Sequence, residues 1–270
     1  MTSNPELTIT MSPLNFHKLQ DKHVLVVGGS SGIGKAVAEG TLASGAKVTI
    51  SSSSQSKVDG AVSTFKSTYP NSQLAGVAID LGKPDTLEAD LETLFKSAVA
   101  ANGTIHHVVY TAGDSLSLGG LDAITVDQMA RASHMRMFVP LMLAKIAARY
   151  LPKERTSSLT ITSGAVVDKP TTGWAVIAFL AGGLSTVVRA LAVDLAPVRV
   201  NVVQPGFVDT PLWDDMDEAT KQATVAAVEK KLLTGKFGLV EDVAEAYLWV
   251  LKDNNVTGTV AKTDAGFLLT

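Results

Sequence analysis

The sequence predicts one α/β domain built on a doubly wound, seven-stranded parallel sheet with helices on both faces. Two observations lead to this fold class. Seven short, β-rich apolar runs recur along the 270 residues, and most stretches between them are long enough for a helix. No repeat, linker or change of composition divides the chain. Because parallel strands need crossover connections that cover both faces of a sheet, strands alternating with helices favour this architecture.

The expected strands are apolar throughout rather than alternating, which is typical of strands buried on both faces. Each run is also short enough to suit a strand better than a helix. The runs begin near residues 23 (HVLVVGG), 46 (AKVTIS), 74 (LAGVAID), 105 (IHHVVYTAG), 158 (SLTITSG), 198 (VRVNVVQPG) and 258 (GTVAKTDAG).

Helices are expected in five of the intervening stretches, at residues 35–44, 86–101, 126–149, 182–196 and 240–252. Gly45 stands where the C-terminal cap of the first helix belongs, and Pro84 with Asp85 suits the first turn of the second. Residues 207–238 are the least regular, and they form either solvated helices or a mobile lid over a pocket at the carboxyl ends of the strands. Residues 1–20 are expected to be a loose tail before the domain at 21–270.

The composition excludes several kinds of partner. The formal net charge of −3 gives no reason to expect nucleic acid or an acidic membrane as a partner. No apolar run reaches the roughly 18 residues of a membrane span, and the start of the chain lacks the pattern of a signal or transit peptide. The chain has no cysteine, and no group of His, Asp and Glu has metal-site spacing. A cytoplasmic protein without a metal is expected.

A glycine-rich turn joins the first expected strand to the first expected helix. In VVGGSSGIGK, Gly28, Gly32 and Gly34 let the backbone turn sharply and approach a pyrophosphate, whose charge the amino end of the helix would meet. A strand before the turn and a helix after it are the context that distinguishes a dinucleotide site from a plain turn. We therefore expect a dinucleotide cofactor at this turn.

This G-x-x-x-G-x-G spacing resembles the short-chain dehydrogenase/reductase family, and the resemblance extends from about residue 22 to residue 269. AIDL contains Asp80 at the family's adenine contact, YTAG at 110–113 stands where Asn-Asn-Ala-Gly is usual, and RVNVVQPGFVDTP matches the Pro-Gly segment beside the nicotinamide. The resemblance implies a Rossmann-type fold, a homodimer or homotetramer, and a set of cofactor contacts. These contacts are Gly28, Ser30, Ser31, Gly32, Ile33, Gly34, Ser52, Ser53, Ser54, Asp80, Leu81, Ala112, Gly113, Pro205, Gly206, Val208 and Thr210.

The end of the second strand, TISSSSQSKV, bears on which nicotinamide cofactor is bound. An NAD site needs an Asp or Glu there for the ribose hydroxyl, and the same carboxylate would repel the 2′-phosphate of NADP. Ser51 to Ser54 carry no charge, and Lys57 follows them. The stretch is either a plain polar loop or a phosphate site, and we favour NADP(H).

Members of the family typically reduce carbonyls with an Asn, a Ser and the pair Tyr-x-x-x-Lys, because the alkoxide that hydride creates needs a proton donor beside it. Ser163 stands at the end of its strand, at the position of the family's serine. The Tyr and Lys are missing. One alignment places Val176 and Leu180 at their positions, and the other places Ile177 and Ala181 there.

Three further residues fall at positions that the family uses in its pocket. Arg136 aligns with the family's asparagine, unless it is a surface or interface charge. Asp168 is either a turn residue before Pro170 or a carboxylate in the pocket, and Trp174 is either packing or an aromatic wall over a flat or cationic substrate. The sequence is similar to a fungal branch of the family that lacks the Tyr and Lys and uses Arg, Asp and Trp in its pocket. That likeness implies these roles for Arg136, Asp168 and Trp174.

Without the tyrosine, the electrophile should need no proton when hydride arrives, and an iminium carbon meets this condition because it becomes a neutral amine. Some members of the similar branch reduce iminium intermediates of indole-alkaloid biosynthesis with NADPH and steer a following Diels–Alder cycloaddition. We expect an NADP(H)-dependent reductase of an imine, iminium or other activated electrophile in secondary metabolism, acting on a small cationic or heterocyclic molecule. Two alternatives stay open. One is an NADP(H)-binding sensor, partner subunit or pericyclase without redox turnover, and the other is a carbonyl reductase that uses Ser163 and Arg136.

Overall fold

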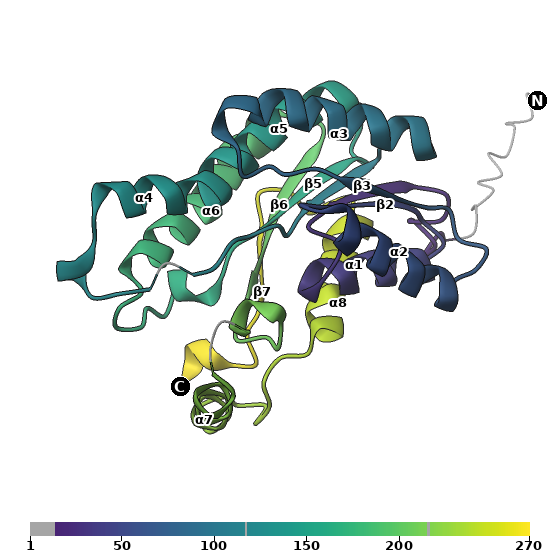
Figure 1. Cartoon of the computed structure of the whole chain (residues 1–270). Helices are drawn as coiled ribbons and strands as arrows, with labels where there is room; N and C mark the ends of the chain where they lie inside the picture. The colour runs from purple at the N-terminus through teal and green to yellow at the C-terminus, as the bar shows by residue number, and fades with distance from the viewer. Residues whose placement is uncertain (1–13, 117, 215–216) are drawn as a thin grey trace, which may run out of the picture.

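A computed structural model describes residues 14–116, 118–214 and 217–270, so most of the expected tail at 1–20 lies outside the described residues. Within these ranges the strands form one seven-stranded parallel sheet in the order β3-β2-β1-β4-β5-β6-β7 (Figure 1). The predicted fold class and the predicted strands are confirmed. The strands are β1 (His23–Val27), β2 (Lys47–Ser52), β3 (Leu74–Ala78), β4 (His107–Tyr110), β5 (Ser158–Thr162), β6 (Arg199–Pro205) and β7 (Val260–Thr263).

Helices connect these strands, and the expected helix ends are present. Gly45 follows the first helix with φ +79°, and its amide donates to the Leu42 carbonyl at 2.9 Å. Pro84 begins the 3-10 turn that leads into the third. The helices are α1 (Gly32–Ala43), α2 (Gln55–Thr68), α3 (Leu87–Asn102), α4 (Val126–Ser133), α5 (Val139–Tyr150), α6 (Ala175–Asp194), α7 (Glu218–Glu229) and α8 (Val240–Lys252).

Three helical regions differ from the sequence expectation. The helix α2 lies in a stretch for which none is predicted, because its apolar stripe is narrow and only Val58, Ala61 and Phe65 are buried. The expected helix at 126–149 is interrupted by a π-helical turn, η3 (His134–Phe138), between α4 and α5. The helix α6 begins at Ala175 rather than near residue 182.

The sheet has a hydrophobic core on each face, because successive side chains of a strand point in opposite directions. Leu25 and Val27 of β1 pack with α3, α5 and α6, whereas Val24 and Val26 pack with α1, α2 and α8. Figure 1 shows these two helix layers on either side of the sheet. Burial on both faces explains why β1 reads as an unbroken apolar run.

The strand order places a ligand-binding crevice beside β1. The chain proceeds outward from β1 to β2 and β3 on one side, then returns to continue through β4 to β7 on the other. At such a switch point the two connections leave in opposite directions, and ligands bind outside the carboxyl ends of the strands. The glycine-rich turn after β1 and the loop after β4 border this crevice.

Among the described residues, α6 is the helix that is long and apolar enough to cross a membrane by length and composition. In this fold its residues Leu184, Val188 and Leu191 pack into the core beside the sheet. Packing inside the domain therefore explains the apolar inner face of α6, whereas Phe179 and Val193 of the same helix are exposed.

Candidate active site

A cavity of about 750 Å³ lies at the carboxyl ends of the strands, lined by segments that follow β1 to β7. We call the lining from the segments after β1, β2, β3 and β4, up to Gly113, the cofactor half. The remaining lining, from the segments after Gly113 and including α6, is the substrate half. Both halves open into one space, so the cavity has room for two molecules side by side.

The glycine-rich turn is pressed against its neighbours in the cofactor half. Gly28 has φ +91°, and a Cβ atom there would lie 2.5 Å from the Ala112 amide nitrogen. A Cβ atom on Gly34 would lie 2.2 Å from the Gly28 carbonyl oxygen. No side chain fits at either position, so the backbone itself forms this wall of the cavity.

The amino end of α1 faces the same space. Ser31, the N-cap of α1, makes no capping hydrogen bond through its side chain, and the first turn contains no acidic residue. The partial positive charge of this helix end therefore meets no competing carboxylate from its own turn, as an anion site requires. Thr210 stands opposite, with its Cβ atom 3.4 Å from the point where a Cβ of Gly32 would be. The residues present fit the pyrophosphate of a dinucleotide cofactor.

Serines and one lysine line the cavity beyond the end of β2. Ser30 Oγ donates to Ser52 Oγ at 2.8 Å, and Ser53 and Lys57 complete this corner. The structure places Ser54 outside the lining, because it is the N-cap residue of α2 and its hydroxyl lies 3.4 Å from that of Ser56. The corner thus offers hydroxyls and an ammonium group, without Ser54.

The other expected cofactor contacts all belong to the lining. Asp80 is oriented by the Gly82 amide, which donates to its Oδ1 atom at 2.9 Å. The contacts that line the cavity are Gly28, Ser30, Ser31, Gly32, Ile33, Gly34, Ser52, Ser53, Asp80, Leu81, Ala112, Gly113, Pro205, Gly206, Val208 and Thr210.

The two alternative alignments of the missing Tyr and Lys are separated by the packing of α6. Ile177 and Ala181 line the cavity. Val176 and Leu180 instead belong to a cluster on the far side of the helix, where they pack with Ala132 of α4. Ile177 and Ala181 therefore occupy the places at which a tyrosine and a lysine would reach the cavity, and that part of the wall is apolar.

Ser163 lines the cavity at the end of β5, and its hydroxyl is engaged by α6. Its Oγ atom donates to the Ala181 carbonyl at 2.9 Å and lies 3.1 Å from Ser185 Oγ. The Ala181 carbonyl thus accepts the hydroxyl hydrogen of Ser163, and Ala181 is the residue at the position where the family has its lysine.

Arg136 also lines the cavity, and it forms an ion pair that was not foreseen. Its guanidinium pairs with the carboxylate of Asp114 and donates to the Asp114 carbonyl at 2.6 Å. The Arg136 side chain is only 15% exposed, and this burial lowers the pKa of its guanidinium. The π-helical turn η3 adds a residue to the helix at this point and so helps to aim Arg136 at the cavity. Asp114 directly follows YTAG, which is the sequence signal that it borders the site.

Tyr110 borders the cavity without replacing the missing tyrosine. Its ring is buried, and its hydroxyl donates to the Met135 carbonyl at 2.5 Å. Burial raises the pKa of this hydroxyl well above its ordinary value, and the nearby charge of Arg136 offsets only part of that effect. The proton of Tyr110 is thus held by the backbone.

Asp168 does not join Arg136, Ser163 and Trp174 in the lining. Its carboxylate accepts a hydrogen bond from Gln204 and lies 3.1 Å from the ammonium of Lys262 in β7. Burial raises the pKa of this carboxyl. The contacts with Gln204 and Lys262 lower the pKa by a larger amount, so it lies below its ordinary value. The loop turns Asp168 toward β7 because its counter-charge stands there, and the expected position in the pocket is corrected accordingly.

Lys169, the next residue, does line the cavity. Its ammonium donates to the Phe267 carbonyl at 2.8 Å, bonds to Thr270, and lies 4.5 Å from the centre of the Phe267 ring. Nothing in the local sequence distinguishes Lys169 from a surface lysine, because its partners come from the far end of the chain.

Four aromatic rings from three parts of the chain line the substrate half. Trp174 is the N-cap of α6, Phe207 follows β6, Trp213 ends the 3-10 turn η5 (Pro211–Trp213), and Phe267 begins the turn η6 (Phe267–Leu269). Each lies within 6.5 Å, ring centre to ring centre, of at least one of the others. We call these four residues the aromatic wall. Only Trp174 was expected, since the others are brought together by the fold.

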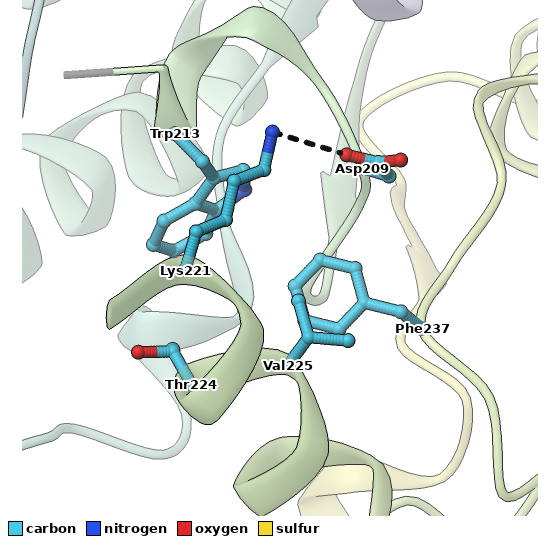
Figure 2. A pocket seen from close by; sticks show the side chains of 6 residues that line it. All are labelled: Asp209, Trp213, Lys221, Thr224, Val225 and Phe237. Carbon is cyan, nitrogen blue, oxygen red and sulfur yellow. Dashed lines mark ion pairs between the residues drawn. The ribbon is translucent and has the colours of Figure 1, made fainter. Parts of the chain in front are cut away.

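The segment expected as a lid, residues 207–238, is described except for 215–216. Its ends are paired by a bridge between Val208 and Gly238, so the segment leaves the sheet and returns at one place. The helix α7 within it has no fully buried residue. Figure 2 shows Lys221 of α7 beside Asp209 and Trp213. These residues line a small hollow of about 10 Å³. Lys221 Nζ lies 3.1 Å from Asp214 and 3.8 Å from Asp209, and these contacts tie α7 to the first turn of the segment.

Comparisons with known proteins agree with this geometry. The chain matches the model of the SDR-like Rossmann domain over residues 15–270. It is 41% identical over 256 residues to the short-chain dehydrogenase/reductase fsr5 of Gibberella fujikuroi, which covers 93% of this chain and 96% of the relative.

Solved structures show the same likeness. The MalC reductase/Diels-Alderase from Malbranchea aurantiaca is 38% identical, with a TM-score of 0.89 over 94% of this chain and 99% of that chain. A small-chain dehydrogenase solved in complex with NADPH is 25% identical, with a TM-score of 0.75 over 93% and 100% of the two chains. Because the domain model and the relatives both span nearly the whole sequence, the chain belongs to the short-chain dehydrogenase/reductase family.

Proposed function

We propose that this protein is an NADP(H)-dependent reductase of an imine, an iminium or another activated electrophile. One observation carries the proposal: Ile177 and Ala181 stand at the cavity wall where the family's proton-donating pair would be. Tyr110, the tyrosine in the lining, directs its proton to a backbone carbonyl. A reaction in this cavity should therefore proceed without a proton from the enzyme during hydride transfer.

The choice of electrophile follows from this condition. When bound, NADPH supplies a hydride. An imine nitrogen that has taken a proton from water, or a quaternary iminium, becomes a neutral amine when its carbon accepts that hydride. A ketone becomes an alkoxide, which needs a proton. The general acid that would supply this proton is missing from the cavity, and such an acid is worth about 10²- to 10⁴-fold in rate. The cavity therefore favours C=N over C=O by roughly that factor.

The cofactor assignment rests on the corner beyond β2. Ser30, Ser52 and Ser53 offer hydroxyls and Lys57 offers a positive charge, which suits the 2′-phosphate of NADPH. A carboxylate, which NAD sites use for the ribose hydroxyl, does not occur among the described lining residues from this end of β2. A related dehydrogenase solved with NADPH supports the same cofactor.

Arg136, Ser163 and Trp174 act from the cavity wall in this proposal. The Arg136 guanidinium, paired with Asp114, donates to a polar atom of the substrate, and Trp174 covers the reacting group. Ser163 polarises that group once its hydroxyl turns away from the Ala181 carbonyl. Asp168 is a positioning residue, because its ion pair with Lys262 fixes the loop that carries Lys169 and leads to Trp174. Since Lys169 also brings an ammonium to the lining, a substrate that carries a negative charge beside its iminium suits the cavity better than a lone permanent cation.

The pathway and the assembly of the protein are proposed from its relatives and from its exposed apolar side chains. The printed name of MalC includes Diels-Alderase, and we infer that this cavity can also template a cycloaddition in a secondary, alkaloid-type pathway. We also propose a cytoplasmic homodimer or homotetramer. Phe179 and Val193 of α6 and Leu141 of α5 are exposed apolar side chains on the helices that such an assembly would use. Light scattering of wild type and Phe179→Asp tests the assembly.

Paired substrates test the reductase proposal. The decrease in NADPH absorbance is followed with dihydroisoquinoline, a cyclic imine, and with tetralone, a ketone of similar size and shape. We expect turnover of the imine at least about 100-fold faster than that of the ketone. Equal rates would contradict the proposal. A protein that binds NADPH tightly but oxidises it with none of these compounds, nor with any other cyclic imine, would be a binding protein without redox turnover.

A carbonyl reductase is the second candidate, because Ser163 and Arg136 both line the cavity. A quinone or a diketone, whose reduced oxygen is a weaker base than an ordinary alkoxide, would then be reduced with help from these two groups alone. Ser163→Ala should abolish this activity. Retention of imine reduction in the same variant would separate the two candidates.

A further inference from the structure

We propose that Tyr110 and His134 are positioning residues, which anchor the π-helical turn η3 to the cofactor half of the cavity and so fix the direction of Arg136. Neither side chain has to touch the substrate for this role. The inference rests on the proposed function, because that function gives Arg136 its contact with the substrate. It is carried by the hydrogen bonds of η3 and by one carbonyl that the turn leaves without a main-chain donor.

That carbonyl belongs to Met135. In an α-helix it would accept a hydrogen bond from the amide of Val139, four residues later. In η3 the Val139 amide donates instead to the His134 carbonyl, five residues before it. The next amide in this pattern would be that of Pro140, which has no N–H. The Met135 carbonyl therefore depends on a donor from outside its own helix.

The Tyr110 hydroxyl is this donor. It donates to the Met135 carbonyl at 2.5 Å, and Tyr110 is only 2% exposed at the end of β4. Water has little access to such a buried carbonyl, and a buried polar group that loses its partner is costly. The hydroxyl of Tyr110 thus stabilises the π-helical turn at the residue directly before Arg136.

A second hydrogen bond anchors the first residue of η3. His134 is buried, and its Nε2 atom lies 2.8 Å from the Leu81 carbonyl. Because a carbonyl can only accept, the Nε2 atom carries the hydrogen. Leu81 follows β3 and lines the cofactor half. The two residues before Arg136 are therefore both tied to the cofactor half, one through its side chain and the other through its carbonyl.

These anchors bear on Arg136 because a guanidinium donates its hydrogen bonds in a fixed plane. Arg136 pairs with the Asp114 carboxylate and donates to the Asp114 carbonyl at 2.6 Å. One residue corresponds to roughly 100° of rotation about a helix axis. Loss of the π-helical turn would therefore rotate this part of the helix and turn Arg136 away from Asp114 and from the cavity.

Chemical labelling of arginines tests this role without turnover. Phenylglyoxal modifies guanidinium groups, and mass spectrometry of peptides gives the rate at Arg136 relative to that at the exposed Arg155 of the same sample. Tyr110→Phe removes one hydroxyl and should raise the relative rate at Arg136 about two- to tenfold, the shift that one hydrogen bond typically gives. His134→Leu leaves Tyr110 intact and should raise it similarly, so the inference stays testable if Tyr110→Phe folds poorly.

Tyr247→Phe is the matched control. Tyr247 of α8 is also a buried tyrosine, and its hydroxyl lies 2.6 Å from the Thr162 hydroxyl, but it packs in the core on the other face of the sheet. This variant should leave the labelling of Arg136 unchanged. The inference is overturned if Tyr110→Phe and His134→Leu both label Arg136 at the wild-type rate, or if Tyr247→Phe raises that rate equally.

A double-variant cycle shows whether Tyr110 acts through Arg136. The value of kcat/KM for dihydroisoquinoline should fall in Tyr110→Phe and in Arg136→Met, and the combined variant should be no slower than Arg136→Met alone. Losses that multiply would mean that Tyr110 acts independently of Arg136, against the inference. If wild type reduces no imine, the proposed function fails, whereas the labelling still decides whether Tyr110 and His134 position Arg136.

Discussion

The two halves of the cavity obtain their properties from different parts of the polypeptide. In the cofactor half, the backbone of the glycine-rich turn and the amino end of α1 form the wall, and Gly28 and Gly34 have no room for a side chain. In the substrate half, side chains form the wall, and we propose that Ile177 and Ala181 stand there in place of two polar residues of the family. A fold can therefore keep its cofactor site while its reaction changes.

The largest expected effect comes from filling the backbone wall. Gly34→Ala brings a methyl group against the Gly28 carbonyl, where nothing flexible can yield. We expect a loss of about 1–3 kcal/mol in the free energy of unfolding, as overpacking typically costs, and loss of measurable NADPH binding. Gly60→Ala in α2 is the matched control, since no atom lies within 4 Å of its Cβ position. Urea titration measures the free energy of unfolding, and NADPH titration measures binding. If Gly34→Ala and Gly60→Ala behaved alike, the backbone would not form the wall of the cofactor half as described.

The next effect tests whether side chains alone separate this enzyme from a ketone reductase. The double variant Ile177→Tyr/Ala181→Lys restores the family's pair at the cavity wall. Both native side chains are nearly buried, so the larger ones should cost about 1–3 kcal/mol of stability. We expect no efficient reduction of tetralone, because the surrounding wall has also changed. Ketone turnover matching that on the imine would show that the two substitutions are the whole difference.

Asp114 lines the cavity, whereas Asp168 lies behind the lining and holds its loop in place, so variants of these two carboxylates should have different effects. Asp114→Asn leaves Arg136 without its counter-charge inside the cavity, and we expect imine turnover to fall at least about tenfold, equal to 1.4 kcal/mol of barrier. Asp168→Asn should lower turnover less and should reduce thermal stability, since it weakens the pair with Lys262. NADPH affinity should change in neither. A larger loss of turnover in Asp168→Asn would return that residue to the catalytic group.

The amino ends of the central strands β1 and β4 offer a change that leaves both halves of the cavity intact. Burial lowers the pKa of His23, His106 and His107 there, most strongly for His107, whose ring contacts Ser158 at 2.8 Å. The unfolded chain takes up protons near the ordinary pKa of 6.5, whereas the folded chain does so only at lower pH. Stability is therefore full above about pH 6.5 and falls below it, by at most about 1.4 kcal/mol per histidine and pH unit. Urea titrations at several pH values should show a shallower fall in His107→Asn.

The smallest effect is expected in α7. Lys221 pairs with Asp209 and Asp214, and both carboxylates are well exposed. Solvent and salt screen such exposed pairs, and they contribute little to stability, so Lys221→Met should change the midpoint of unfolding little. Any effect should appear as a modest change in KM for the imine. A large loss of stability would mean that α7 belongs to the core.

The sequence predicts the elements whose signal is local. The apolar runs identify every strand, and the turn after β1 identifies the cofactor half, because both depend on neighbouring residues. The start of α6 and the π-helical turn before α5 lack such signals, since Trp174 offers no usual cap and the extra residue of the turn is invisible in HMRMF. The direction of Asp168 depends on Lys262 in a distant strand. Contacts between residues far apart in the sequence therefore determine which side chains line the substrate half.

The bridge between Val208 and Gly238 has a consequence for how new specificities arise. Because the two ends of the 207–238 segment are held side by side, its length and sequence can change while the distance between the anchoring points stays the same. The segment behaves as an exchangeable cassette that carries Phe207 and Trp213 into the cavity. Recombination among relatives at these two positions would change Phe207 and Trp213, and with them the lining of the substrate half, while the sheet and the glycine-rich turn stay untouched.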